Sequence, residues 1–153
     1  MSKDYFLHER LLRGENFQDL LGSVTIVGCG ATGSNLADNL VRQGFKKINL
    51  IDFDRVEEHN LNNQIYSLTD VSYLKADSLA GKLHNISLSL DIKTFPKMKI
   101  TDKTVKKAFQ TDLVVDCLDN KEGRLCLQNY FRNNIFKKQC DLLHLGVGDR
   151  VRS

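Results

Sequence analysis

Short apolar runs alternate along the chain with longer segments in which apolar residues recur at helical spacing. The short runs are nearly continuous in valine, isoleucine and leucine, a pattern typical of strands buried on both faces of a parallel sheet. They predict strands over residues 24–27, 48–51, 90–95, 113–117 and 142–145. The single proline, Pro96, directly follows the third run, where its missing N–H interrupts no central strand.

The longer segments predict helices over residues 32–43, 71–85, 102–109 and 121–136. A further short helix, residues 16–21, is expected to pack outside the core, within an N-terminal helical segment of residues 1–22. Alternating strands and helices predict an α/β fold of the Rossmann-like, doubly wound kind, with a mostly parallel sheet and helices on both faces. Ligands of such sheets bind beyond the carboxyl ends of the strands, so the loops after the first, second and fourth strands should share one crevice.

Length and composition narrow the picture further. At 153 residues the chain can bury one sizeable core, so we expect a single domain over residues 1–153. The net charge of +3 is small and the lysines lie in scattered pairs, which argues against a nucleic-acid partner. No apolar run approaches the ~20 residues that cross a bilayer, and the N-terminus does not read as a signal peptide. We therefore expect a cytoplasmic protein with no membrane partner. The four cysteines stand singly, without the paired spacing of a zinc site.

A G-x-G-x-x-G pattern made by Gly28, Gly30 and Gly33 joins the first predicted strand to the helix after it. In this context the first glycine permits a tight turn, the second lets a phosphate approach the backbone, and the third lets the helix pack closely. The amide groups at the helix start then face an anion. The pattern indicates a nucleotide-phosphate site, and the alternative is a purely structural turn.

Acidic residues follow the second predicted strand. Asp52 lies about 20 residues after the glycines, where a carboxylate can accept hydrogen bonds from ribose hydroxyls. This favours a nucleotide with a free 2′-hydroxyl but does not separate NAD from ATP. Asp54 is either a second carboxylate of the site or a turn former.

An amide-rich run, Asn60-Leu61-Asn62-Asn63-Gln64, comes next. Amides donate and accept hydrogen bonds without adding charge, which suits contact with phosphate oxygens or a substrate carboxylate. Asparagine also tolerates left-handed turn geometry, and composition alone favours that second interpretation.

Three segments in order resemble one known family. VTIVGCGATGSNLADNLVRQGFKKINLID is similar to its opening βαβ unit, DFDRVEEHNLNNQ to its D-x-D-x-V-x-x-x-N-L-N-R-Q signature, and VVDCLDNKEGR to its D-C-x-D-N segment. The family is ThiF/MoeB/HesA, adenylating enzymes related to ubiquitin-activating enzymes. The resemblance covers about residues 11–146, and the N-L-N-x-Q run is its most specific part.

The resemblance implies roles for individual residues. Asp52 would hold the ribose of ATP, Asn60 would lie near the phosphates, and Gln64 would belong to the nucleotide site. Lys75 would bind the α-phosphate, although outside this context it would be a solvated helix lysine. Asp119 would bind Mg2+ and be needed for adenylation, whereas Asp116, inside a strand, could be a structural acid.

The resemblance also implies a reaction and partners. ATP and Mg2+ would activate the C-terminal carboxylate of a ubiquitin-like or sulfur-carrier protein as an acyl adenylate, with release of pyrophosphate. Mg2+ and a lysine reduce the charge repulsion that a carboxylate meets at the α-phosphorus. A homodimer is implied as well.

Two departures from the family pattern bear on activity. Asn63 stands where the family has arginine, so either a neighbour such as Arg55 replaces that cation or nucleotide binding is weak. The family also takes an arginine from an N-terminal segment of the partner subunit, for which Arg10, Arg13 and His8 are the candidates here.

The second departure is length, because the resemblance implies that family members continue beyond the point at which residue 153 lies. The chain stops soon after the fifth predicted strand, and Cys126 and Cys140 lie in a predicted helix and at a strand start, where neither is expected to be a thioester nucleophile. An excised N-terminal domain, a shortened member and one part of a larger assembly all agree with this length.

Two other functions stay open. An NAD-dependent oxidoreductase could use the same turn and acid, and would draw its proton-transfer group from His59, His84 or His144. A non-catalytic relative could keep the fold for nucleotide or partner binding alone.

Overall fold

The computed structural model describes residues 7–14, 18, 21–97, 106–134 and 140–145. Its centre is a five-stranded sheet in the order β3-β2-β1-β4-β5, in which every neighbouring pair is parallel. The strands are β1 (Val24–Val27), β2 (Lys47–Ile51), β3 (Asp91–Phe95), β4 (Leu113–Asp116) and β5 (Asp141–His144). Each predicted strand agrees with the observed one to within about one residue at either end, because continuous apolar runs between polar turns mark buried strands.

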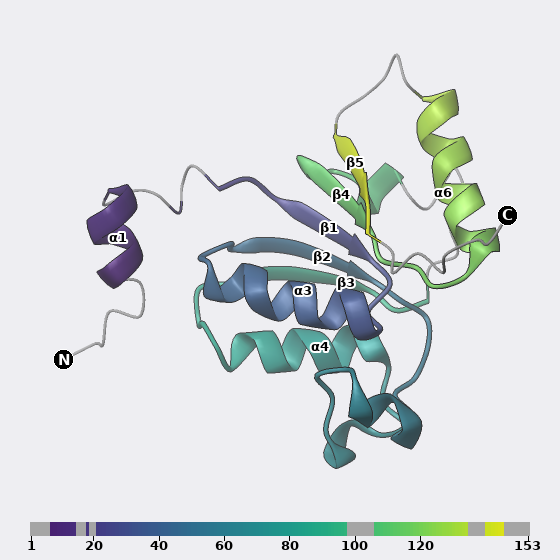
Figure 1. The fold of residues 1–153 in the computed structure, drawn as a ribbon, viewed down its shortest axis with the longest axis horizontal. Helices are drawn as coiled ribbons and strands as arrows, with labels where there is room; N and C mark the ends of the chain where they lie inside the picture. The colour runs from purple at the N-terminus through teal and green to yellow at the C-terminus, as the bar shows by residue number, and fades with distance from the viewer. Residues whose placement is uncertain (1–6, 15–17, 19–20, 98–105, 135–139, 146–153) are drawn as a thin grey trace, which may run out of the picture.

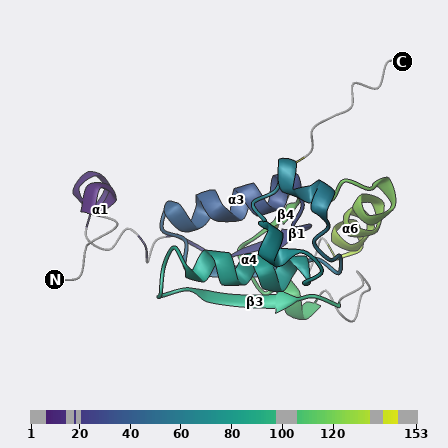
Figure 2. The same ribbon diagram turned by 90° about the horizontal axis from the view of Figure 1, so that it is seen from below.

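Helices lie on both faces of this sheet (Figures 1 and 2). The helices α3 (Ala31–Arg42) and α4 (Lys75–His84) contact each other and cover one face, while α6 (Lys121–Asn133) packs against the other. Residues 106–108 are helical and lie on the α6 face. The predicted Rossmann-like, doubly wound α/β fold is therefore confirmed. Of the helices in the described ranges, none is long and apolar enough to cross a bilayer.

The helix predicted over residues 71–85 is wrong in its first turn. The loop after β2 contains two 3-10 helices, η1 (Glu58–Asn62) and η2 (Leu68–Asp70), and α4 begins only at Lys75. Ser72 has a φ of 75°, and the backbone of Ser72 and Tyr73 is hydrogen-bonded to Val56 instead. Backbone pairing with a distant segment thus overrides the local helical pattern.

The N-terminal segment differs from the expectation as well. The described helix there is α1 (Leu7–Arg13), which Figure 1 shows beyond the end of the sheet where β1 begins. The helix predicted over residues 16–21 lies mostly outside the described residues, as do the first part of the helix predicted over 102–109 and the last residues of that over 121–136.

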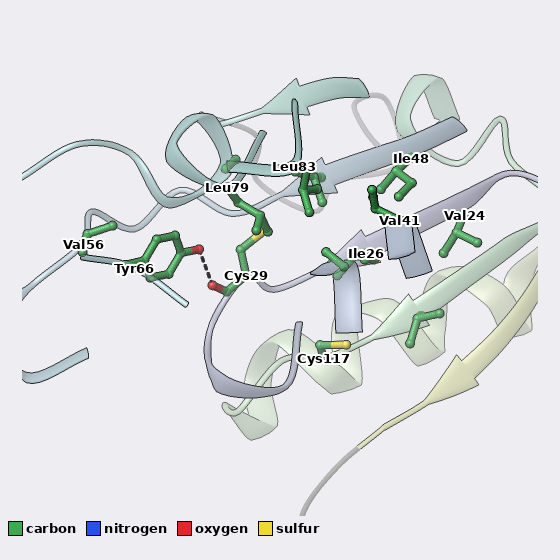
Figure 3. Close-up of a cluster of buried hydrophobic side chains, with 14 residues drawn as sticks. Val24, Ile26, Cys29, Val41, Ile48, Val56, Tyr66, Leu79, Leu83 and Cys117 are labelled. Carbon is green, nitrogen blue, oxygen red and sulfur yellow. Dashed lines mark hydrogen bonds between the residues drawn. The ribbon is translucent and has the colours of Figure 1, made fainter. Parts of the chain in front are cut away.

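Two hydrophobic clusters hold the layers together. The larger lies between the sheet and the α3 and α4 helices, and Figure 3 shows its side chains. The smaller lies on the α6 face and includes Val114, Phe109 and Leu127. Each fully buried leucine or isoleucine contributes about 1.5–3 kcal/mol relative to an exposed one. Because both faces of the central strands are covered, β1, β2 and β4 are held rigidly relative to one another.

The strand order places a crevice at a defined point. The chain leaves β1 through α3 to reach β2 on one side, and later returns to add β4 on the other side of β1. The order therefore reverses at β1, and the loops that leave the carboxyl ends of β1 and β4 diverge there.

Candidate functional site

A cavity of about 420 Å³ opens beyond the carboxyl ends of β1, β2 and β4. Its lining comes from the turn after β1, the loop after β2, the start of α4 and the loop after β4. All of the predicted site residues line it except one: Gly28, Gly30, Asp52, Asp54, Asn60, Gln64, Lys75 and Asp119. Gly33 is the exception, because it is buried behind the turn. The crevice expected from the loops after β1, β2 and β4 is therefore present.

The glycine turn is shaped by two close approaches. Gly28 has a φ of +95°, and a Cβ there would lie 2.9 Å from the carbonyl oxygen of Cys117. A Cβ on Gly33 would lie only 1.7 Å from the carbonyl oxygen of Gly28, so α3 rests directly on the turn. A Cβ on Gly30 would meet nothing closer than 3.7 Å, at Nε2 of Gln64. The first and third glycines are thus required by packing, whereas the second faces open space in the cavity.

The start of α3 presents backbone amides to this space. Gly30 is the N-cap residue, no side chain caps the helix, and Ala31 and Thr32 line the cavity. Amides of the first turn have no partner within their helix and carry the positive end of the helix dipole. An anion in the cavity would meet these groups without competition from a side-chain cap.

Asp52 ties the end of β2 to the glycine turn. Its Oδ2 accepts a hydrogen bond of 2.7 Å from the Cys29 N–H, and its Oδ1 accepts one of 2.8 Å from the Asp54 N–H. Burial raises the pKa of Asp52, and the two hydrogen bonds act against that rise. A carboxyl whose pKa is higher in the folded than in the unfolded protein stabilises the fold at pH values below its unfolded-state pKa. That contribution is lost as the pH rises through its folded-state pKa. Asp52 therefore has a structural role in addition to any contact with a ligand.

Two more side chains hold the loop after β2 in place. Asn60 is buried, and its Oδ1 accepts a hydrogen bond of 2.9 Å from the Glu57 N–H, which fixes η1. Tyr66 donates a hydrogen bond of 2.6 Å from its hydroxyl to the Cys29 carbonyl, as Figure 3 shows. Tyr66 does not line the cavity but supports the glycine turn, and no local pattern reveals that its hydroxyl reaches a turn 37 residues away.

Lys75 and Gln64 are polar groups whose bonding is incomplete within the protein. Lys75 is only 7% exposed, and among the described residues no carboxylate lies within ion-pair distance of its ammonium group. The Gln64 Oε1 atom is buried and has no hydrogen-bond partner among the residues that the structure describes. Burial of a charge or a polar atom without a partner costs free energy. Since both residues line the cavity, a ligand there could satisfy them.

Asp119 lies on a loop that is fixed from several sides. Its carboxylate is exposed in the cavity. The preceding residue, Leu118, donates its N–H to Asp116 Oδ1 at 3.0 Å and accepts a hydrogen bond of 2.5 Å from Arg124 Nε. Arg124 Nη2 also donates to the Leu145 carbonyl at 2.9 Å, so one guanidinium joins the loop to the end of β5. Arg124 lies in the VVDCLDNKEGR segment, but the sequence does not predict its role in holding this loop.

Asp116 is a structural acid, as the sequence suggested. It is fully buried, and its Oδ2 lies 2.7 Å from His144 Nδ1 on the neighbouring strand. His144 is thereby engaged away from the cavity. Of the other two histidines considered for proton transfer, His59 lines the cavity and lies 3.2 Å from Glu57, while His84 ends α4 and does not line it.

The cavity also holds Asn63, which stands where the resembled motif has arginine, and Arg55, the neighbour considered as a replacement for that cation. Arg10 and Arg13, in α1, do not line the cavity, and Figure 1 shows α1 at the opposite end of the sheet. Within one chain these two arginines therefore do not reach the site.

The buried cysteines are expected to be unreactive in the folded protein. Burial raises the pKa of Cys29 well above its usual value and raises that of Cys117 to about 12, so neither is a thiolate at neutral pH. A thiol-exchange reagent such as Ellman's reagent at pH 7.5 should label the exposed Cys126 rapidly, and Cys29 and Cys117 only after unfolding. Rapid labelling of all thiols in the folded protein would contradict this.

Comparisons with known proteins agree with this geometry. Residues 10–138 match the family model described as the ThiF family. The chain is 31% identical over 118 residues to ubiquitin-like modifier-activating enzyme 5 of Drosophila mojavensis, which covers 69% of this chain and 29% of that protein. It is 30% identical over 124 residues to adenylyltransferase and sulfurtransferase MOCS3 of Mus musculus, which covers 80% of this chain and 27% of that protein.

A similar fold is found in a solved bacterial structure. The E. coli tRNA N6-threonylcarbamoyladenosine dehydratase TcdA, in complex with ATP, matches with a TM-score of 0.81 and 27% identity, covering 96% of this chain and 61% of that chain. The chain spans less than a third of the length of the two curated relatives above. Because the family model covers most of the chain and the motifs that it shares line one cavity, this protein belongs to the ThiF family.

Proposed function

We propose that this chain is the nucleotide-binding part of an adenylyltransferase. It would use ATP and Mg2+ to activate the C-terminal carboxylate of a ubiquitin-like or sulfur-carrier protein as an acyl adenylate, releasing pyrophosphate. The single observation that carries the proposal is that the glycine turn, Asp52, Lys75 and Asp119 line one cavity, although they come from four separate segments. The names of two relatives, a modifier-activating enzyme and an adenylyltransferase, support the same activity.

The groups in the cavity suit this chemistry. The uncapped amides of α3 and the buried Lys75 attract the negative charge of the phosphates, and Asp52 offers carboxylate lone pairs to ribose hydroxyls. An approaching carboxylate would otherwise be repelled by the α-phosphate. Preorganised cationic and N–H groups lower that barrier because they need no reorganisation during the reaction.

The donor set also fits a magnesium ion that arrives with the nucleotide. Mg2+ usually keeps several waters and is held by one or two carboxylates together with substrate phosphates. Across the described residues no cluster of three or more His, Cys, Asp or Glu side chains could hold a metal alone. The exposed Asp119 would supply the protein's carboxylate, held in place by the bonds of Leu118. When bound, the ion supplies charge neutralisation at the phosphate oxygens.

Mg-ATP is expected to stabilise the isolated chain. At about 100 times its dissociation constant a ligand adds about 2.7 kcal/mol to the free energy of unfolding, which corresponds to a rise in Tm of about 5–11 °C for a chain of this size. Differential scanning fluorimetry with Mg-ATP, ATP plus EDTA, and NADH measures this directly. A larger rise with Mg2+ than with EDTA would support the metal role of Asp119, and Asp119→Asn should remove that difference.

The same measurement separates the alternatives. Stabilisation by NADH but not by ATP would favour an oxidoreductase. Among the described residues His59 is the histidine that lines the cavity, and it is already paired with Glu57, so a proton-transfer group for that reaction is less available. No shift with any nucleotide would favour a non-catalytic relative. Exchange of labelled pyrophosphate into ATP, run with and without candidate carrier proteins, then distinguishes an enzyme from a binding domain. Adding tRNA as a separate arm tests the substrate class named for the bacterial structure.

Assembly and location complete the proposal. We expect a homodimer, a carrier protein as partner, no nucleic-acid or membrane partner, and a cytoplasmic location. Light scattering of the purified protein at several concentrations measures the oligomeric state, and fractionation of cells expressing a tagged chain measures the location.

A further inference from the structure

The charges around the cavity are unbalanced for a ligand with several phosphates. Four carboxylates line it, from Asp52, Asp54, Glu57 and Asp119. The fixed cationic side chains in the lining are Lys75 and Arg55. Lys75 supplies one positive charge and Mg2+ would arrive with the nucleotide, so a second fixed cation would further offset the carboxylates and the three phosphates. Arg55 is the guanidinium available for this within the described part of the chain.

Arg55 is anchored next to Lys75. It forms an isolated antiparallel bridge with Leu74, the residue directly before Lys75, and the Lys75 N–H donates a hydrogen bond of 2.9 Å to the Asp54 carbonyl. The two cationic residues thus start from adjacent points of one wall of the cavity. Lys75 is buried, whereas Arg55 is exposed, so Arg55 is the more accessible of the two to solvent.

Most N–H donors of the Arg55 guanidinium have no hydrogen-bond partner in the described part of the chain. Arg55 Nη1 donates a hydrogen bond of 2.8 Å to the Ser72 carbonyl, while Nε and Nη2 have no partner among the described residues. A guanidinium carries five N–H donors in a planar fork that matches phosphate oxygens. One bond to Ser72 holds the side chain in place and leaves the rest of the fork for a ligand.

The loop that carries Arg55 also brings three amides and the carboxylates of Asp54 and Glu57 to the cavity. Asn60, Asn63 and Gln64 line the cavity beside Arg55 without charge, and Glu57 is engaged by His59 and by the Asn60 N–H. The carboxylates of Asp52 and Asp119 come from the ends of β2 and β4 instead. Phosphate groups are therefore expected along the wall that carries Arg55 and Lys75.

We propose that Arg55 binds the phosphates beyond the α-phosphate, so that the site selects nucleoside di- and triphosphates over monophosphates. Arg55 thereby supplies the charge that Asn63 does not. This inference rests on the proposed function, because it assumes a nucleotide in this cavity.

Calorimetric titration of the chain with Mg-ATP, Mg-ADP and AMP tests the proposal. Arg55→Gln should weaken Mg-ATP about 10- to 100-fold, the range for hydrogen bonds to charged groups, and should leave AMP affinity unchanged within about twofold. Arg55→Lys keeps the charge but loses the fork, so an intermediate loss is expected. Arg42→Gln is the matched control, because Arg42 pairs with Asp38 on α3 and does not line the cavity.

A second variant separates charge from local structure. Asn63→Arg in the Arg55→Gln background should recover most of the Mg-ATP affinity, because it returns a guanidinium to the same wall. Equal losses for ATP and AMP in Arg55→Gln, or unchanged ATP affinity, would overturn the role of Arg55. A wild-type chain that binds none of the three nucleotides would instead overturn the proposed function itself, so the two failures are distinguishable.

Discussion

Replacing Gly33 with alanine is expected to destabilise the protein by at least about 3 kcal/mol, although the change adds only one methyl group. A Cβ at this position would lie 1.7 Å from the Gly28 carbonyl oxygen and 3.2 Å from the Ile26 side chain. The obstacle is backbone, which cannot rotate away as a side chain can. The helix α3 must therefore move off the turn, and nucleotide binding should be lost with it.

Gly81 provides the matched control within another helix. It lies in the middle of α4, and a Cβ there would have nothing within 4 Å. Gly81→Ala should stabilise the protein by roughly 0.5–1 kcal/mol, because alanine is the better helix former. Urea unfolding followed by circular dichroism measures both variants. Similar unfolding midpoints for the two would show that α3 does not rest on the turn as described.

Replacing Lys75 with methionine is expected to separate stability from function. Lys75 is only 7% exposed, and in the described structure no carboxylate lies within ion-pair distance of its ammonium group. Burial raises the pKa of Asp52, and the charge of Lys75 acts to lower it. Removal of the Lys75 charge should change the Tm of the ligand-free protein little, because the loss of this charge interaction opposes the gain from removing a desolvated charge. Binding of Mg-ATP should weaken about 10- to 100-fold, and the rate of any adenylation should fall about 10²- to 10³-fold. Calorimetry and pyrophosphate exchange measure these two losses.

Lys82→Met is the control for that substitution. Lys82 lies on the same helix, pairs with Asp70 at 2.8 Å and does not line the cavity. Its loss should cost no more than about 1 kcal/mol of stability and should leave nucleotide affinity unchanged. If Lys75→Met bound Mg-ATP as well as Lys82→Met does, Lys75 would have no part in the site.

Local patterns were enough to predict the strands and the glycine turn. A continuous apolar run predicts the β1 strand, and the spaced glycines predict the turn after it. The close backbone contacts at Gly28 and Gly33 explain why glycine is needed at these positions. The loop between β2 and α4 could not be predicted in the same way. Residues 71–74 have helical spacing of apolar side chains. However, the backbone of Ser72 and Tyr73 is hydrogen-bonded to Val56, and Leu74 forms a bridge with Arg55.

Long-range contacts account for most of what the sequence concealed in the site. Arg124 holds the Asp119 loop by donating to the carbonyl oxygens of Leu118 and Leu145. Every residue has a backbone carbonyl, so the sequence does not reveal which ones Arg124 contacts. The pattern likewise predicts Asp52 as a ribose ligand but not that both of its oxygens already accept backbone N–H groups. The roles of Lys75, Asn60 and Asp119 toward a nucleotide stay predictions until they are measured.

The placement of β4 beside β1 bears on the order in which the parts of the cavity come together during folding. The two strands are joined at their start by bonds between Ser23 and Asp112, which are 89 residues apart. Closing so long a loop costs chain entropy before the pairing compensates for it, so β4 is expected to dock late. A chain emerging from the ribosome would hold the glycine turn and Lys75 well before Asp119 arrives. The capacity to bind nucleotide should therefore appear at the end of refolding, where a fluorescent ATP analogue would report completion of the sheet.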